Sequence, residues 1–451
     1  MRCASAPPLS TDAYEHAGVS TIDSVEPQAL PPLRNPAFLG LMGYRLFTIL
    51  SYQIVAVAVG WHVYELTGDP WKLGLIGLAE VLPFFCVAPF AGYLVDHLPK
   101  RRLGIIACIG LTMTPALLAA VAWGLVFGEA EDAHSRLWLI YAAIMFTGAV
   151  RAFLGPVYNT LFACVLPREQ FTRGSSIGSV VFQSALVLGP AISGGVIGLV
   201  KTLGLYPAHS AALAGPAYAL GVLCALGAVL ALATLRTTEP ALSRERSPIF
   251  ASIGEGLRFV FQTPVMLGAM ALDMFAVLFG GAISLAPAFI KDVLHAGPEA
   301  LGLLRAAPAA GAVIVGLWLA RRPIERHAGR FMLYAVAGFG LCIIGFGLSK
   351  TLWLSIAFMF LSGIFDGVSV VLRSTILQLA TPDHMRGRVS SINSIFISSS
   401  NELGAFYAGS MAKLLGLTTA VVVGGCVTLG VTGFTAWKLP VLRRLNLREL
   451  H

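Results

Sequence analysis

Long apolar segments separated by short polar ones fill the sequence from Pro36 onward. A helix needs about 20 apolar residues to cross the hydrocarbon core of a bilayer, and twelve runs approach or exceed that length. None shows the alternating pattern of a membrane β-strand. The pattern predicts an all-α membrane protein with twelve transmembrane helices. The predicted spans are 36–66, 73–95, 103–127, 137–166, 175–200, 211–235, 264–290, 301–320, 331–348, 352–379, 389–415 and 418–437.

Composition supports this class. Of the 451 residues, 56% are hydrophobic and only 12% are charged, whereas soluble proteins carry about 25% charged residues. The net charge of +8 does not indicate nucleic acid as a partner, because the basic residues lie in short loops between apolar runs. The seven cysteines form no Cys-x-x-Cys pair, so we expect neither a disulfide framework nor a metal site.

The basic residues predict the orientation. With the N-terminus in the cytoplasm, the cytoplasmic segments hold 21 Lys and Arg residues and the outer segments hold 6. This bias follows the positive-inside rule and predicts that both termini are cytoplasmic. The first 33 residues are polar, with no apolar stretch followed by a cleavage site, so we expect a disordered tail rather than a signal peptide.

The second half of the chain repeats the first. "PREQFTRGSSIGS" begins at Pro167 and "PDHMRGRVSSINS" at Pro382, an offset of 215 residues. Nearer the start of each half the offset is 228, which aligns Gly74 with Gly302. Two parallel six-helix halves are the layout of alternating-access transporters. The predicted division is a cytoplasmic tail at 1–35, a six-helix bundle at 36–236, a cytoplasmic linker with an amphipathic segment at 237–263, a second six-helix bundle at 264–438 and a cytoplasmic tail at 439–451.

Three motifs carry a family resemblance. "GYLVDHLPKRR" (92–102) resembles the G-x-L-x-D-R-x-G-R-[KR] loop between helices 2 and 3 of the major facilitator superfamily, with His97 and Pro99 as departures. "RAFLG" (151–155) resembles its helix 4 motif, and "GPAISGG" (189–195) its helix 5 exporter motif. The resemblance covers nearly the whole chain. "WHVYELTG", "LPREQF" and "TPDHMRGRVSSINS" are most similar to the enterobactin exporter branch, which holds siderophore and multidrug exporters.

Charged residues inside the predicted spans are candidate site residues, because charge at bilayer depth is costly and faces a cavity or a partner. They are Arg45, Glu80, Arg151, Asp273, Arg305, Asp366, Arg373 and Glu402. The repeat aligns Arg45 with Asp273 and Arg151 with Asp366. The resemblance implies that these four residues, on helices 1, 4, 7 and 10, line the central cavity. We hypothesise that each Arg pairs with an Asp across the halves and that protonation of the Asp releases it. Static ion pairs are the alternative, and Arg305 is also a candidate contact for an anionic substrate group.

Two further groups of residues are expected to take part in the alternation between inward-open and outward-open states. The first group, a conformational gate, comprises Gly92, Asp96, Arg101, Arg386 and Arg388. The resemblance places Asp96 beside the cytoplasmic end of helix 11, where it would meet Arg386 or Arg388 when the halves close inside. Gly189, Pro190 and Gly194 are the candidate hinge of helix 5, since small residues permit close helix approach.

The sequence thus predicts a secondary active transporter of the bacterial inner membrane, a monomer that exports a siderophore or drug-like compound. The proton gradient would supply the energy, without a cofactor. Uptake, or lipid movement by the same fold, is the alternative. An enzyme is disfavoured because the G-x-S-x-G match at Gly174 opens a membrane helix and follows no strand. A channel would need a filter or an oligomeric pore, and a receptor would not need Arg and Asp at repeat-related positions.

Overall fold

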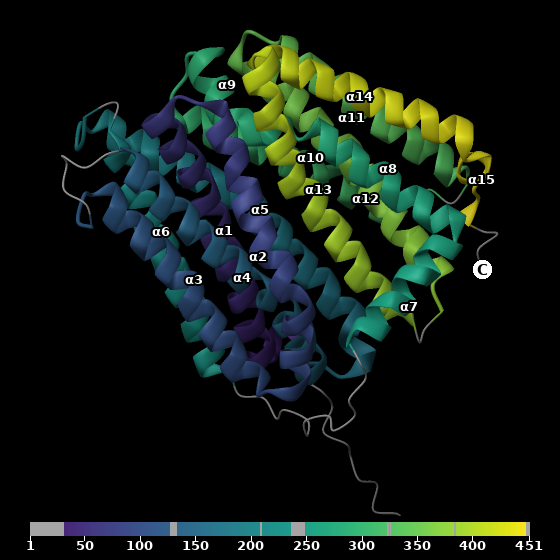
Figure 1. The fold of residues 1–451 in the computed structure, drawn as a ribbon. Helices are drawn as coiled ribbons and strands as arrows, with labels where there is room; N and C mark the ends of the chain where they lie inside the picture. The colour runs from purple at the N-terminus through teal and green to yellow at the C-terminus, as the bar shows by residue number, and fades with distance from the viewer. Residues whose placement is uncertain are drawn as a thin grey trace, which may run out of the picture.

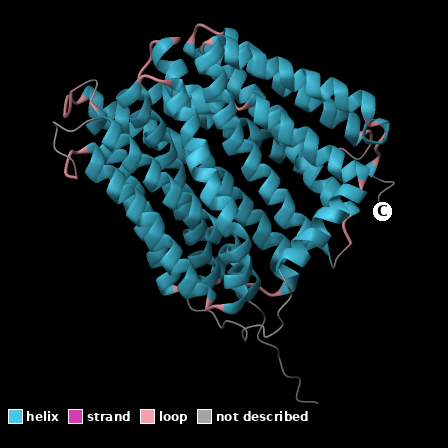
Figure 2. Cartoon of the chain, in the orientation of Figure 1, coloured by secondary structure: helices cyan, strands magenta, loops and turns pink. Residues whose placement is uncertain are grey.

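The computed structural model describes residues 31–126, 133–207, 210–235, 249–322, 324, 326–382 and 385–447. Within these ranges every regular element is a helix (Figure 2). The prediction of an all-α membrane fold in two six-helix halves is therefore confirmed.

Six long helices form the first half. They are α1 (Pro36–Thr67), α2 (Pro70–His97), α3 (Lys100–Ala122), α4 (Ala133–Val165), α5 (Phe171–Thr202) and α6 (Gly215–Thr234), with 3₁₀ turns η1 (Pro32–Arg34), η2 (Arg168–Gln170) and η3 (Ala211–Ala214). Local signals fix the first hairpin. Asn35 caps α1, Gly68 ends it in the left-handed conformation, and the Asp69 side chain accepts from the Trp71 amide to begin α2.

The second half has one broken span and five continuous helices. The broken span comprises α8 (Pro264–Gly280), η4 (Ala282–Leu285) and α9 (Ala286–Asp292). The others are α10 (Pro298–Arg321), α11 (Ala328–Leu348), α12 (Leu352–Ala380), α13 (Arg386–Leu415) and α14 (Leu417–Lys438), followed by the short α15 (Pro440–Arg443). The predicted linker contains α7 (Ile249–Gln262), which covers its amphipathic segment.

Helix α13 differs in composition from the other spans. Eleven segments in the described chain are long and apolar enough to cross a membrane, and α13 is not among them. Its serines, Asn393, Asn401 and Glu402 lower its hydropathy. Its 30 residues still make a rod of about 45 Å, longer than the hydrocarbon core of about 30 Å. A polar spanning helix must face protein or water rather than lipid, so α13 indicates where the polar interior lies.

Two pairs of glycines join the halves at one end of the molecule. Helix α2 packs along α13 and α5 along α10. A Cβ atom added at Gly74 would lie 3.0 Å from the Cα of Gly409, and one at Gly194 would lie 2.6 Å from the Cα of Gly302. The repeat offsets of 228 and 215 convert the first pair into the second. The same contact is therefore made twice, once on each side of the pseudo-twofold axis.

The two ends of the bundle differ. We call the end carrying Thr67 and Pro70 the outer end and the end carrying Pro36 the inner end, after the predicted orientation. At the outer end Lys291 pairs with Glu65 at 3.0 Å, and the hydroxyl of Tyr64 donates to Asp292. Toward the inner end the two halves diverge (Figure 1). The structure is thus closed at the outer end.

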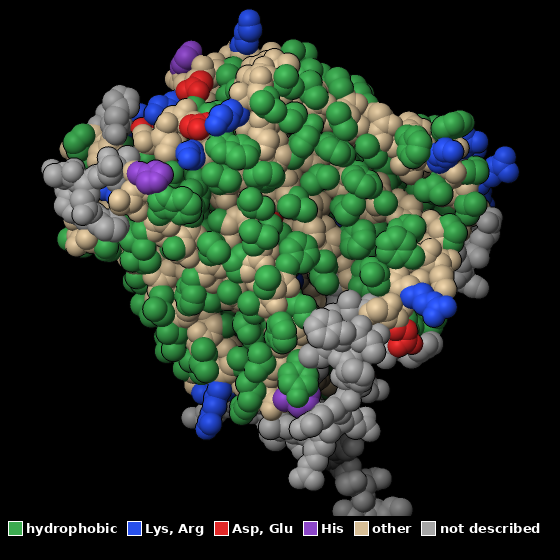
Figure 3. Space-filling view, viewed as in Figure 1, with side chains coloured by type: hydrophobic (Ala, Val, Ile, Leu, Met, Phe, Trp, Pro, Cys, Tyr) green, Lys and Arg blue, Asp and Glu red, His purple; other side chains and the backbone are tan. Residues whose placement is uncertain are grey.

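The surface has the distribution of a membrane protein. Apolar side chains cover the middle of the face in Figure 3, and Lys, Arg, Asp and Glu gather toward its two ends. Large hydrophobic residues are exposed on several helices, among them Ile106, Leu223 and Trp353 at 65%, 65% and 76%. Such exposure is favourable only against lipid, so this belt is the part that the bilayer surrounds.

Candidate functional site

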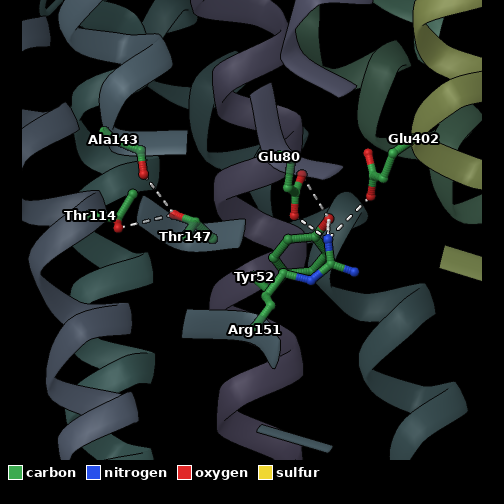
Figure 4. A network of polar contacts seen from close by, with 7 residues as sticks. All are labelled: Tyr52, Glu80, Thr114, Ala143, Thr147, Arg151 and Glu402. Atoms are coloured by element: carbon green, nitrogen blue, oxygen red, sulfur yellow. Dashed lines mark hydrogen bonds and ion pairs between the residues drawn. The ribbon is translucent and has the colours of Figure 1, made fainter. Parts of the chain in front are cut away.

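Arg151 of α4 is the centre of a polar network near the middle of the molecule (Figure 4). Its Nη1 donates to Glu80 of α2, to the hydroxyl of Tyr52 of α1 at 2.9 Å and to Oε1 of Glu402 of α13 at 3.2 Å. The guanidinium carbon lies 4.2 Å from the centre of the Tyr52 ring. Glu80 and Tyr52 belong to the same half as Arg151, whereas Glu402 belongs to the other. One guanidinium therefore connects the two halves.

Two glycines bring the helices of this network together. A Cβ atom at Gly148 would overlap the carbonyl oxygen of Glu80, and one at Gly77 would overlap that of Glu402. Glycine at these sites allows α4 to approach α2, and α2 to approach α13, at backbone distance. On α4, Thr147 also contacts the Thr114 hydroxyl of α3 at 3.0 Å. The carboxylates are positioned by close backbone packing rather than by loops.

Arg305 of α10 adds a second positive charge nearby. Its Nη1 donates to the carbonyl oxygen of Ala56 in the first half at 3.2 Å, and it lies within electrostatic range of Glu80 and Glu402. When both carboxylates are ionised, the positive charges of the two arginines equal the negative charges of the two glutamates, so the group has no net charge. Because the side chains of Glu80 and Glu402 are only 8% and 16% exposed, this balance is set by the protein more than by solvent. Protonation of either glutamate would leave an excess positive charge between the halves.

A second polar cluster lies wholly inside the second half. Asp273 of α8 pairs with Arg373 of α12 at 2.9 Å and accepts from the Ser369 hydroxyl at 3.3 Å. Arg373 also donates to Asn393 of α13 at 3.3 Å. Asp366, two helical turns from Arg373, lines a small cavity together with Asp273. Both members of the ion pair are about 95% buried, whereas Asp366 is partly buried, so this cluster has two carboxylates and one guanidinium largely shielded from solvent.

The predicted cross-half pairs are not formed in this structure. Asp273 pairs with Arg373 of its own half instead of Arg45, and Arg151 pairs with glutamates instead of Asp366. Arg45 stacks over Tyr158 at 4.0 Å and Phe182 at 5.2 Å, and its Nε has no hydrogen-bond partner. The reason is that the halves meet through α2 with α13 and α5 with α10, and not mainly through the helices that carry Arg45, Asp273 and Asp366.

The gate residues are described only in part. Arg101 donates through Nε to the carbonyl oxygen of Leu232 at 2.8 Å and through Nη2 to that of Ala233, at the end of α6 in its own half. A Cβ at Gly92 would meet nothing within 4 Å. The side chains of Asp96, Arg386 and Arg388 lie outside the described part of the structure, so their contact stays a prediction.

The candidate hinge residues of α5 are packing contacts in this state. A Cβ at Gly189 would lie 2.5 Å from that of Gln53 of α1, and Gly194 faces Gly302. Helix α5 is continuous from Phe171 to Thr202 through Pro190. These residues set the distance of α5 from its neighbours, and bending at Pro190 stays a prediction.

The sequence of this chain matches a known family of membrane proteins. Residues 41–405 and 279–449 match the sequence profile of the Major Facilitator Superfamily. The chain belongs to this superfamily. It is a transporter rather than an enzyme, as the sequence predicted.

Relatives of this superfamily member include two kinds of exporter. The multidrug efflux pump Tap of Mycobacterium tuberculosis is 26% identical over 422 residues, covering 92% of this chain and 96% of Tap. The enterobactin exporter EntS of Escherichia coli O1:K1 / APEC is 25% identical over 428 residues, covering 92% of this chain and 93% of EntS.

Solved structures share the fold at low identity. A bacterial homologue of the iron transporter ferroportin in an inward-facing state matches with a TM-score of 0.67 at 16% identity, over 90% of this chain and 99% of that one. The inward-open xylose transporter XylE of E. coli matches with a TM-score of 0.65 at 12% identity, over 89% and 95%.

Proposed function

We propose that this transporter is a proton-coupled exporter of a small molecule, a siderophore or a drug-like compound, that works by alternating access. The observation that carries the proposal is the contact of Arg151 with Glu402, which links the halves through a group whose charge a proton can change. The relatives that pump drugs or export enterobactin favour export over uptake.

In this proposal the structure is the inward-facing state of the cycle. The glycine pairs close the outer end, and the halves diverge at the inner end, which the positive-inside rule assigns to the cytoplasm. In this state substrate would enter between the halves from the cytoplasm. The same bias supports cytoplasmic termini, and the bacterial relatives support a bacterial inner membrane as the location.

Protonation of Glu402 would release the outer closure. An ionised Glu402 attracts Arg151 and holds α13 against the first half. A neutral Glu402 loses most of this attraction, and the unbalanced guanidiniums of Arg151 and Arg305 then favour separation of the halves. For export, a proton from outside must bind while the outer end is open and leave to the cytoplasm after the outer end closes, in exchange for substrate that moves outward. Asp273 and Asp366 are the second candidate proton site, because Asp366 lines the same small cavity as Asp273, whose carboxylate pairs with Arg373.

Transport driven by an imposed pH gradient tests this proposal. We expect proteoliposomes containing the full chain to move ethidium against its gradient when protons flow in the opposite direction. In E402Q we expect this pH-driven transport rate to be at least about tenfold lower. D273N and D366N separately test the second site. E169Q, which removes an exposed carboxylate from the 3₁₀ turn η2, is the matched control.

Each result decides between alternatives. Movement of ethidium together with the protons would establish uptake and contradict export. Wild-type coupling in E402Q would contradict the role of Glu402. Wild-type coupling in both D273N and D366N would remove the second cluster from the mechanism and leave it a structural ion pair.

A further inference from the structure

A groove runs along the outside of the second half, between α11 and α14. Its volume is about 510 Å³, within the range of sites for small ligands. Leu333 and Tyr334 of α11 and Leu429 of α14 form its sides, with the small residues Ala337 and Gly433 between them. A Cβ at Gly433 would meet nothing within 4 Å, so this position opens onto free space in the groove.

This groove faces the bilayer and not the transport path. Helices α11 and α14 pack mainly against each other and against α8, α12 and α13 of their own half. Tyr334 is 70% exposed on the rim of the groove. Among the helix pairs in substantial contact, neither α11 nor α14 is paired with a helix of the first half. A molecule that fills the groove must therefore be amphiphilic or apolar and must arrive from the membrane.

Two arginines line the same groove at the inner end. Arg330 lies at the start of α11, and Arg443 ends α15. Buried Leu442 anchors α15 beneath the bundle, where its carbonyl oxygen packs so closely on Gly329 that a Cβ there would overlap it. Arg330 and Arg443 are exposed, and neither has an acidic partner within the described residues. Within the described part of the chain, two guanidiniums without an ion pair thus lie beside an apolar channel.

We propose that this groove binds one anionic phospholipid of the inner leaflet, with the phosphate on Arg330 and Arg443 and an acyl chain along Ala337 and Gly433. Basic pockets between membrane helices on the cytoplasmic side suit anionic lipid headgroups, and guanidinium groups bind phosphate by charge-assisted hydrogen bonds. The inner-end position of both arginines puts the phosphate at headgroup depth and the apolar channel at acyl depth. The lipid would brace α15 and α14 against α11.

Native mass spectrometry of the purified full chain tests this site. The probes are phosphatidylglycerol, phosphatidylcholine and glycerol 3-phosphate, each titrated onto delipidated protein. We expect R330Q/R443Q to weaken the first phosphatidylglycerol-binding step about 30-fold, which is about fivefold for each arginine. The binding of phosphatidylcholine should be unchanged. The control R321Q/R322Q removes two exposed charges from the inner end of α10 that do not line the groove.

A second variant tests the acyl channel without touching the charges. A leucine side chain at Gly433 has space to enter the groove. We therefore expect G433L to fold and to weaken the binding of both phosphatidylglycerol and phosphatidylcholine. G430L, also in open space on α14 but not lining the groove, is its control.

Three results would overturn the proposal. Equal losses in R321Q/R322Q would show general attraction of anionic lipid to the inner end. Equal binding of glycerol 3-phosphate would show a site for free phosphate. Unchanged lipid binding in both R330Q/R443Q and G433L would show that the groove holds no lipid.

Discussion

Leucine at Gly194 or at Gly409 will shift the transporter toward a state that is open at its outer end. Gly194 faces the backbone of Gly302, and Gly409 faces the backbone of Gly74, at distances that admit no Cβ atom. Because backbone cannot rotate away as a side chain can, the closed outer end must separate. Overpacking of this kind costs about 1–3 kcal/mol, which changes the ratio of the two states about 5- to 150-fold. Since the repeat relates the two contacts, we expect G194L and G409L to shift the ratio by similar amounts.

Labelling by a membrane-impermeant maleimide at an outer-end cysteine measures this shift. The reporter is a single cysteine in place of Glu65, whose side chain is only 5% exposed beside Lys291 in the closed outer end. We expect much faster labelling in G194L and G409L. The control is G195L, because a Cβ at Gly195 meets nothing within 4 Å. Equal labelling of the G194L, G195L and unsubstituted proteins would show that the glycine contacts do not hold the outer end closed.

Replacement of Arg151 will abolish transport and destabilise the protein. In R151M the side chain of Glu80, only 8% exposed, loses its ion-pair partner. Removal of one partner of a buried pair costs about 3–5 kcal/mol, because the remaining charge is uncompensated. We therefore expect a large loss of thermal stability in detergent and no pH-driven transport. R151K keeps the charge but not the forked donors, so it should recover part of the stability.

A double variant separates stability from function. E80Q/R151M removes both charges and should regain most of the stability lost by R151M, because no unpaired carboxylate remains at Glu80. It should still lack transport, because Glu402 no longer has a partner in the first half. Stability in R151M equal to that of the unsubstituted protein would contradict the network. Normal transport in the double variant would remove Arg151 from the mechanism.

The sequence predicted the fold well because a bilayer imposes a simple physical requirement. Each span must be helical and apolar over about 20 residues, and this pattern is visible without an alignment. The repeat offset of 228 also aligned Gly74 with Gly302, which the structure places at equivalent contacts between the halves. The run 389–415 was counted among the apolar spans, and the structure has the more polar helix α13 there.

Side-chain pairing was harder to predict, because it depends on which helices touch in one state of the cycle. The repeat aligned Arg45 with Asp273, yet a symmetry relation does not make two residues neighbours. Arg151, Glu80 and Glu402 were all identified as candidates, but the pairing of Arg151 with the two glutamates was not predicted. Gly77 and Gly148 allow α2 to approach α13 and α4 to approach α2, so these glycines are the sequence feature that could have indicated the pairing. The roles of Tyr52, Ser369 and Asn393 were missed, since uncharged polar residues in a span have little sequence signature.

Distance measurements between spin labels test alternating access most directly. In a variant without native cysteines, one label pair replaces Leu98 and Arg326 at the inner end, and a second replaces Leu203 and Leu414 at the outer end, all of them exposed. We predict that acid pH, or E402Q at neutral pH, lengthens the outer distance and shortens the inner one. Distances that stay fixed, or that change in the same direction at both ends, would contradict proton-driven alternation of the two halves.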